Sequence, residues 1–276
     1  MDAAAAAARP GARPLTGRDL PGLAESLMRI AERAGAAIMN IYDSGFTVQH
    51  KDDDSPLTQA DLESQRLILE GLKRLTPDIP ILSEESAAAP WDARQNWREL
   101  WVVDPLDGTR EFIKRNGEFT VNIALIVEHE PKLGLVAAPA QGITFWGIAG
   151  VGAFSRRHGS EAHRIQTTAP QQPLRVVGSR SHPSPQTAAY LARLGPHVIS
   201  AVGSSLKFAL LAEGKADLYP RFGPTSEWDT AAGQAVLEAA GGHVTRMDGH
   251  PMRYNCRESL INGDFVAFSD PSVLPP

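Results

Sequence analysis

The sequence predicts a mixed α/β fold in which helices and sheets alternate in layers. Two observations lead to this prediction. The first half of the chain carries a run of strand patterns with short turns, and residues 119–127 alternate cleanly between apolar and other side chains. The second half, from residue 175 onward, alternates strand and helix patterns. A chain of 276 residues with 42% hydrophobic residues can bury the core that such a fold requires.

Two helices are expected before the first strands. Apolar residues recur at helical spacing from Leu23 to Ile41, which predicts an amphipathic helix that ends near Gly45. Thr58 and Asp61 form a capping pattern at the start of a second helix. The buried face of this helix is expected to carry Leu62, Leu69, Leu72 and Leu75.

The remaining elements follow the same patterns. Strands are expected at 79–83, 101–103, 119–127, 133–139, 143–148 and 152–156, which favours a meandering antiparallel sheet. Further strands are expected at 175–178, 198–202 and 216–219, with helices at 187–194, 206–213 and 230–240. A polar connector at 167–173 divides the chain into halves at 21–168 and 169–276, preceded by a disordered tail at 1–20.

Composition excludes several classes of protein. A net charge of −5 argues against a general nucleic-acid binder, which would present a basic surface. We expect no transmembrane segment and no signal peptide, because no apolar run approaches about 18 residues. Cys256 is the single cysteine, so a disulfide framework is excluded and a reducing cytosol is favoured. We expect Cys256 to be a small core residue.

The strand at 101–103 runs into a turn that carries two carboxylates. The turn reads DPLDGT and extends from Asp104 to Thr109. Pro105 has no amide proton, so the strand cannot continue in regular register. Asp104 and Asp107 are therefore expected to project from a tight turn.

The other residues of this turn complete a set of oxygen ligands. The Leu106 carbonyl lies between the two carboxylates, Gly108 permits close backbone approach, and Thr109 adds a hydroxyl. Such a set suits a hard divalent cation that holds a phosphate. The same residues are also compatible with an ordinary loop turn.

Two further acidic clusters stand at element boundaries. Glu84 and Glu85 follow the strand at 79–83, and Asp229 lies at the start of the helix that follows Glu227. At these positions the side chains of the three clusters can converge.

These motifs resemble the lithium-sensitive, magnesium-dependent phosphomonoesterase superfamily, which includes inositol monophosphatase, fructose-1,6-bisphosphatase and the 3′(2′),5′-bisphosphate nucleotidases. Residues 104–125 and 203–233 look specifically like the CysQ-type nucleotidase branch. The resemblance covers roughly residues 23–268. It implies a layered αβαβα sandwich with the active site between the halves.

The resemblance also implies the metal ligands. Glu84, Asp104 and the Leu106 carbonyl match one Mg²⁺ site, and Asp104, Asp107 and Asp229 match a second. A third, weaker ion beside Glu84 is left open. Several of these groups, namely Glu84, Leu106, Asp107 and Asp229, would also contact the substrate phosphate.

The resemblance assigns the proton transfer to Thr109 and Asp61, with Glu84 as the third member of the catalytic set. Asp61 is also compatible with an ordinary acidic residue at a helix start. The amides of Gly108 and Thr109 would hold the phosphate, and Lys51 can reach the carboxylates.

Substrate identity depends on the second half of the chain. Ser204, Lys207 and Arg221 match the groups that the nucleotidase branch places around a second phosphate, together with residues 179–182. Taken singly, such groups are usually solvated, and Ser204 and Ser205 can also cap the following helix.

The resemblance therefore predicts a Mg²⁺-dependent enzyme that hydrolyses 3′(2′)-phosphoadenosine 5′-phosphate, or its sulfated analogue, to the 5′-nucleotide and phosphate. The attacking water would be activated by the metal. The reaction would recycle a by-product of sulfur assimilation. Inositol monophosphatase is the alternative within the same class, and a catalytically silent nucleotide sensor is the alternative outside it. The expected partner is a small-molecule nucleotide and the expected location is cytoplasmic. Peripheral membrane association stays open, as does the choice between monomer and homodimer.

Overall fold

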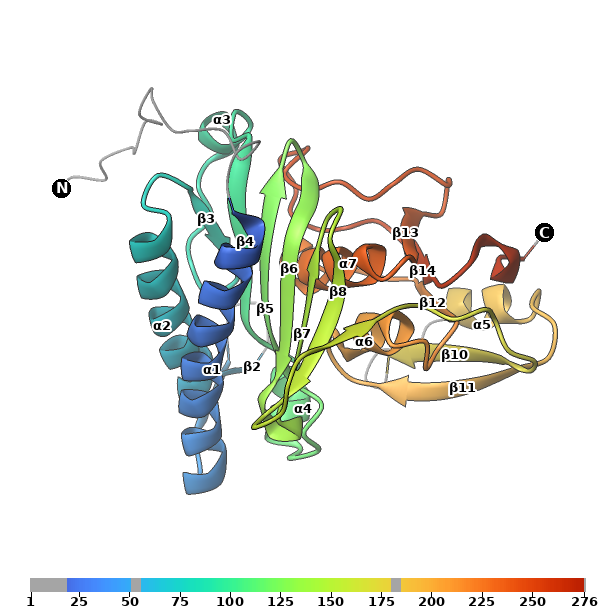
Figure 1. Cartoon of the computed structure of the whole chain (residues 1–276), viewed down its shortest axis with the longest axis horizontal. Coiled ribbons are helices and arrows are strands. Elements are labelled where there is room, and N and C mark those ends of the chain that lie inside the picture. The colour runs from blue at the N-terminus through green and yellow to red at the C-terminus, as the bar shows by residue number, and fades with distance from the viewer. Residues whose placement is uncertain (1–18, 51–55, 180–184, 276) are drawn as a thin grey trace.

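The computed structural model describes residues 19–50, 56–179 and 185–275. Five layers follow one another across the molecule (Figure 1): a helix pair, a seven-stranded sheet, a second helix pair, a five-stranded sheet and a final short helix. This is the mixed, layered αβαβα architecture expected from the sequence. Of the tail predicted at 1–20, residues 1–18 lie outside the described residues. The prediction was wrong at its last two positions, because Asp19 caps the first helix, which begins at Leu20.

The larger sheet is built from the first half of the chain. In sheet order its strands are β3 (Ile81–Ser83), β4 (Glu99–Asp107), β5 (Thr120–Val127), β6 (Glu130–Ala138), β7 (Ile143–Ile148), β8 (Gly152–Arg157) and β9 (His163–Ile165). Strands β4 to β9 pair antiparallel, which confirms the predicted meander, whereas β3 pairs parallel with β4.

The smaller sheet is built from the second half. In sheet order its strands are β11 (His197–Val202), β10 (Leu174–Ser179), β12 (Leu218–Arg221), β14 (Phe265–Phe268) and β13 (His243–Arg246). The first three are parallel, and β14 is antiparallel to both of its neighbours. Strands β13 and β14 were not predicted from the sequence. A separate two-stranded ribbon joins β1 (Val48–His50) and β2 (Pro56–Thr58).

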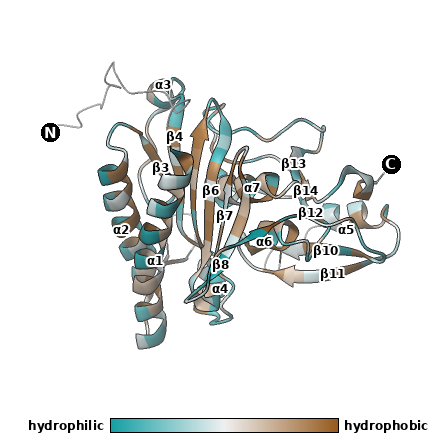
Figure 2. Ribbon diagram, viewed as in Figure 1, coloured by the Kyte–Doolittle hydropathy of each residue, from teal (hydrophilic) through white to brown (hydrophobic). Residues whose placement is uncertain are grey.

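Strand β4 shows why the larger sheet is buried on both faces. Trp101 and Val103 belong to the apolar cluster beneath the first helix pair. Leu100 and Val102 belong to the cluster between the two sheets. Because side chains alternate along a strand, a continuous apolar run fills both clusters. Figure 2 shows the hydrophobic residues gathered along the central strands of this sheet.

The first helix pair consists of α1 (Leu20–Ser44) and α2 (Gln59–Leu75). The α1 helix ends at Gly45 as expected, and Thr58 caps α2 in a reciprocal pair with Asp61. The expected buried face of α2 was wrong at Leu62, which is 48% exposed. The buried positions are Ala60, Asp61, Ser64, Ile68 and Leu72. Two of these five residues are polar, so a count of apolar residues did not find this face.

The central helix pair consists of α6 (Leu206–Ala212) and α7 (Glu227–Ala239), and α5 (Pro185–Leu191) covers the outer face of the smaller sheet. Gly134 and Gly147 let α7 lie directly on the larger sheet, because a Cβ at either position would stand 2.5 Å from a backbone oxygen of α7. This close approach brings the start of α7, and with it Asp229, to the carboxylates at the end of β4.

Two short helices, α3 (Trp91–Arg94) and α4 (Thr109–Ile113), and two 3₁₀ turns, η2 (Pro139–Gln141) and η3 (Pro271–Val273), complete the described elements. Cys256 is exposed, so its expected place in the core was wrong. Its neighbour Tyr254 is the residue that fills the core at this point. None of the helices in the described ranges combines the length and apolar composition that crossing a membrane requires.

Candidate active site

The turn at the end of β4 is held in a fixed shape. The register between β4 and β5 breaks between Asp104 and Asp107, where Pro105 cannot donate to the ladder. The Ser64 hydroxyl of α2 donates to the Pro105 carbonyl at 2.7 Å, and the Leu106 amide donates to Asp104 Oδ1 at 3.0 Å. Both bonds are buried, so the two carboxylates leave the turn in defined directions.

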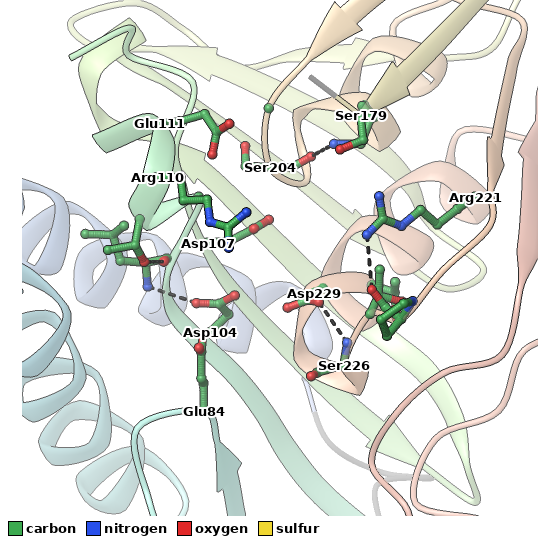
Figure 3. Close-up of a pocket in the computed structure, with 18 of the residues that line it drawn as sticks. Glu84, Asp104, Asp107, Arg110, Glu111, Ser179, Ser204, Arg221, Ser226 and Asp229 are labelled. Carbon is green, nitrogen blue, oxygen red and sulfur yellow. Dashed lines mark hydrogen bonds between the residues drawn. The ribbon is translucent and has the colours of Figure 1, made fainter. Parts of the chain in front are cut away.

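Three carboxylates meet at this turn. Ligand oxygens of Asp104, Asp107 and Asp229 all lie within 4.8 Å of one another. Asp229 reaches the group from the first turn of α7, where its Oδ2 accepts from the Ser226 amide at 2.8 Å. Figure 3 shows Glu84 pointing toward Asp104 from the end of β3, so the acidic clusters of both halves face one pocket.

The buried carboxylates of this cluster repel one another, and a bound cation would reduce that repulsion. Burial, reinforced by Glu84 and the other two aspartates, raises the pKa of Asp104 well above its ordinary value. Burial, followed by the charge of Asp107, raises the pKa of Asp229 to about 8. Burial also raises the pKa of Asp107, against the effect of the Lys207 ammonium. A divalent cation offsets this repulsion, and an all-oxygen donor set is the one that Mg²⁺ prefers. The residues therefore fit a metal site.

Thr109 lies at the junction of the turn and α4. Gly108, with φ of +91°, makes the reversal that starts this short helix. The Thr109 hydroxyl donates to Asp61 Oδ1 at 3.1 Å, and Asp61 Oδ2 accepts from both the amide and the hydroxyl of Thr58. Burial raises the pKa of Asp61. Thr109 lines the pocket and Asp61 lies behind it, so Asp61 can act on a substrate only through Thr109.

The second half of the chain closes the same pocket, which has a volume of about 360 Å³. Ten residues predicted from the sequence line it: Glu84, Asp104, Leu106, Asp107, Gly108, Thr109, Ser204, Lys207, Arg221 and Asp229. Ser179 lines it too, while Lys51 and residues 180–182 lie outside the described residues.

The two pocket-lining cations from the second half of the chain, Lys207 and Arg221, face the pocket in different ways. The Lys207 ammonium donates to the carbonyls of Val202 and Ser204, at 3.2 and 2.5 Å, and burial lowers its pKa to about 8. Arg221 Nη2 donates to the Pro224 carbonyl at 3.1 Å. Arg221 Nε is buried and has no hydrogen-bond partner within the described part of the chain. Figure 3 shows the Arg221 guanidinium extending into the pocket from the side opposite Glu84.

Sequence reasoning missed two polar residues beside the carboxylates. Asn122 of β5 and Ser205 at the start of α6 both donate to Asp107 Oδ2, at 3.3 and 2.8 Å. The available signal was Asn122 itself, a polar residue inside a strand whose residues from Val121 to Val127 are otherwise apolar. The expected capping role of Ser205 was wrong, because its side chain makes no cap hydrogen bond to α6.

Comparison with known proteins agrees with this fold. The sequence profile of the inositol monophosphatase family matches residues 19–268. The chain therefore belongs to the inositol monophosphatase family. Phosphatases of this family are metal-dependent, and the acidic cluster is consistent with such an ion.

Within the family, the chain is similar to proteins named 3′(2′),5′-bisphosphate nucleotidase CysQ. The protein of Salmonella typhimurium is 51% identical over 243 residues, which cover 87% of this chain and 97% of that relative. The Escherichia coli protein is 49% identical with the same coverage. The crystal structure of CysQ from Bacteroides thetaiotaomicron, described as a bacterial member of the inositol monophosphatase family, superposes with a TM-score of 0.79 at 39% identity, over 90% of this chain and 97% of that one.

Proposed function

We propose that this chain is a Mg²⁺-dependent 3′(2′),5′-bisphosphate nucleotidase that removes the 3′-phosphate from 3′-phosphoadenosine 5′-phosphate and leaves AMP and phosphate. The sulfated analogue would give adenosine 5′-phosphosulfate in the same way. The observation that carries the proposal is the polarity of the pocket, with the carboxylates on one side and Arg221 on the other. The names of relatives at about half identity support the same activity.

Each end of the pocket suits one phosphate of such a substrate. A phosphate ester can approach the carboxylate side only through a cation, because four acidic side chains line it. The Arg221 guanidinium, which extends into the pocket from the other side, can donate to a second anion. Lys207 has one ammonium proton left after its two carbonyl partners, and Ser204 adds a hydroxyl. We assign these three residues to the 5′-phosphate.

The metal ligands are proposed as expected from the sequence. Asp104, Asp107 and Asp229 would share one Mg²⁺, and Glu84, Asp104 and the Leu106 carbonyl a second, with a third weaker ion beside Glu84 left open. Bound Mg²⁺ supplies positive charge to the phosphate oxygens and makes a water acidic enough to lose its proton near neutral pH.

The protein residues then accept that proton. Thr109 Oγ1 already donates to Asp61, so its lone pairs are available to a water in the pocket. As the water attacks phosphorus and loses a proton to Thr109, the Thr109 proton passes to Asp61. The raised pKa of Asp61 favours this transfer. The leaving ribose oxygen takes a proton from solvent, and the amides of Gly108 and Thr109 orient the phosphate.

Two alternatives make different demands on the pocket. The substrate of an inositol monophosphatase has one phosphate, so it would leave Arg221 without an anionic partner. A silent nucleotide sensor would not need the complete set of carboxylates, which this pocket retains. Both considerations favour the nucleotidase.

Phosphate release from a small panel of substrates tests the proposal. The panel contains 3′-phosphoadenosine 5′-phosphate, its sulfated analogue, 3′-AMP, inositol 1-phosphate and fructose 1,6-bisphosphate, each assayed with Mg²⁺ and with a chelator. We expect the adenosine bisphosphate to give the highest kcat/KM and the chelator to stop release. Preference for inositol 1-phosphate would replace the nucleotidase with the alternative phosphatase, and no release from any substrate would favour the sensor.

Four further expectations stay predictions. The first is that residues 21–168 carry most of the metal ligands and residues 169–276 carry Asp229 and the nucleotide-contacting residues. The others are the cytoplasmic location, the oligomeric state (monomer or homodimer) and peripheral association with a membrane.

A further inference from the structure

The Ser205 hydroxyl joins three elements at one point. Its oxygen lies 2.8 Å from Asp107 Oδ2 on β4 and 2.8 Å from the Asp229 carbonyl on α7. The same oxygen accepts from Asn122 Nδ2 of β5 at 2.8 Å. A hydroxyl has a single proton, so Ser205 shares that proton between the carboxylate and the carbonyl. Ser205 is 1% exposed, so water does not compete for these bonds.

Asn122 is held in one orientation beside it. Its Nδ2 also donates to Asp107 Oδ2, at 3.3 Å, and the residue is 1% exposed. Its Oδ1 has no partner among the residues that the structure describes. The side-chain nitrogen thus makes two hydrogen bonds while the side-chain oxygen makes none, although leaving a buried acceptor unpaired is costly. Asn122 therefore presents hydrogen to Asp107 and to Ser205.

The backbone before Ser205 is fixed to the other half of the chain. The Gly203 amide donates to Glu118 Oε2 at 2.8 Å, and the Ser204 carbonyl accepts from Lys207. Ser205 is thus placed by contacts to both halves.

We propose that Asn122 and Ser205 are positioning residues for cation binding. By donating to Asp107 Oδ2 they set the rotation of this carboxylate, so that its other oxygen faces Asp104 and Asp229. Through the Asp229 carbonyl, Ser205 also fixes the start of α7 relative to β4. This inference rests on the proposed function in one respect, namely that Asp107 binds the cation.

The test measures cation binding without substrate. Mn²⁺ binding is followed by the electron paramagnetic resonance of the free ion, in the unaltered protein and in Ser205→Ala and Asn122→Leu variants. Loss of partners that orient a metal ligand typically lowers affinity by about 10- to 100-fold, and we expect losses of that size. Ser205→Thr retains the hydroxyl and should recover most of the affinity. The double variant should lose less than the product of the single losses, because the two residues act on the same oxygen.

Ser155→Ala provides the matched control. Ser155 is also completely buried, and its hydroxyl lies 3.0 Å from His163 Nε2 on the far strands of the sheet. We expect Ser155→Ala to change the melting temperature and leave Mn²⁺ affinity unchanged.

Unchanged Mn²⁺ affinity in both Ser205→Ala and Asn122→Leu would overturn the inference, since the pair would then only support the fold. The substrate panel decides the proposed function separately. If the panel gave no phosphate release while Ser205→Ala still weakened Mn²⁺ binding, the positioning role would stand and the nucleotidase assignment would fall.

Discussion

Arg221 offers the sharpest test of the substrate class, because we propose that it binds the second phosphate of the substrate. The residue is 9% exposed, and its Nη2 donates a hydrogen bond to the Pro224 carbonyl. Its Nε lacks a partner within the described residues. An anion in the pocket can accept a hydrogen bond from the end of the guanidinium, which extends into the pocket.

The size of the effect follows from the proposed hydrogen bond between the guanidinium and the second phosphate. A hydrogen bond to a charged group contributes about 1.5–3 kcal/mol, and each 1.4 kcal/mol is about tenfold. Arg221→Ala should therefore lower kcat/KM for 3′-phosphoadenosine 5′-phosphate by about 10- to 100-fold more than for 3′-AMP. The variant also leaves the Pro224 carbonyl unbonded and opens a cavity. Those costs are common to both substrates and cancel in the ratio.

The assay compares phosphate release from the two substrates at a fixed Mg²⁺ concentration. Arg221→Lys keeps the charge without the planar fork and should fall between the parent protein and Arg221→Ala. Arg98→Ala is the control, since the Arg98 side chain is 81% exposed and pairs with Glu128. Equal losses on both substrates would show that Arg221 supports the fold or the metal site, and the assignment of a second phosphate would then fail.

Three further predictions concern the carboxylates and the proton path. Asp107→Asn should abolish turnover yet keep or raise the metal-free melting temperature, because it removes a like charge from the cluster; near-normal turnover at saturating Mg²⁺ would contradict the ligand assignment. Thr109→Ala should lower kcat by about 10²–10⁴-fold with a small change in KM. Asp61→Asn should lower kcat by a similar factor, and the double variant should lose little more than either single variant. Fully additive losses in kcat would show that the two residues do not act in the same step. Burial raises the pKa of Asp229 from 3.8 to about 8 in the metal-free protein, so the folded state favours its protonated form. This contribution to stability is complete below the unfolded pKa and is lost as pH rises through the folded pKa. The metal-free melting temperature should therefore fall as pH rises from about 4 to about 8. Asp229→Asn should flatten that fall, and an unchanged slope would show that other groups cause it.

Most of the elements and the carboxylates of the site could be predicted from local sequence patterns. The strand patterns and helix caps are local, because each depends on residues a few positions apart. The DPLDGT turn was predictable for the same reason, since Pro105 interrupts the ladder wherever the strand is placed. The position of Asp229 at a helix start could be read from its neighbours.

The tertiary structure decided which polar groups meet. Asn122 and Ser205 are 83 positions apart in the chain, and they touch only because α6 and α7 pack against the larger sheet. The same packing makes Ser205 a partner of Asp107, 98 positions away in the chain, although its place before α6 predicted a helix cap. Side-chain hydrogen bonds act over about 3 Å, so contacts between distant segments exist only after the layers have assembled. No local pattern in the sequence records them.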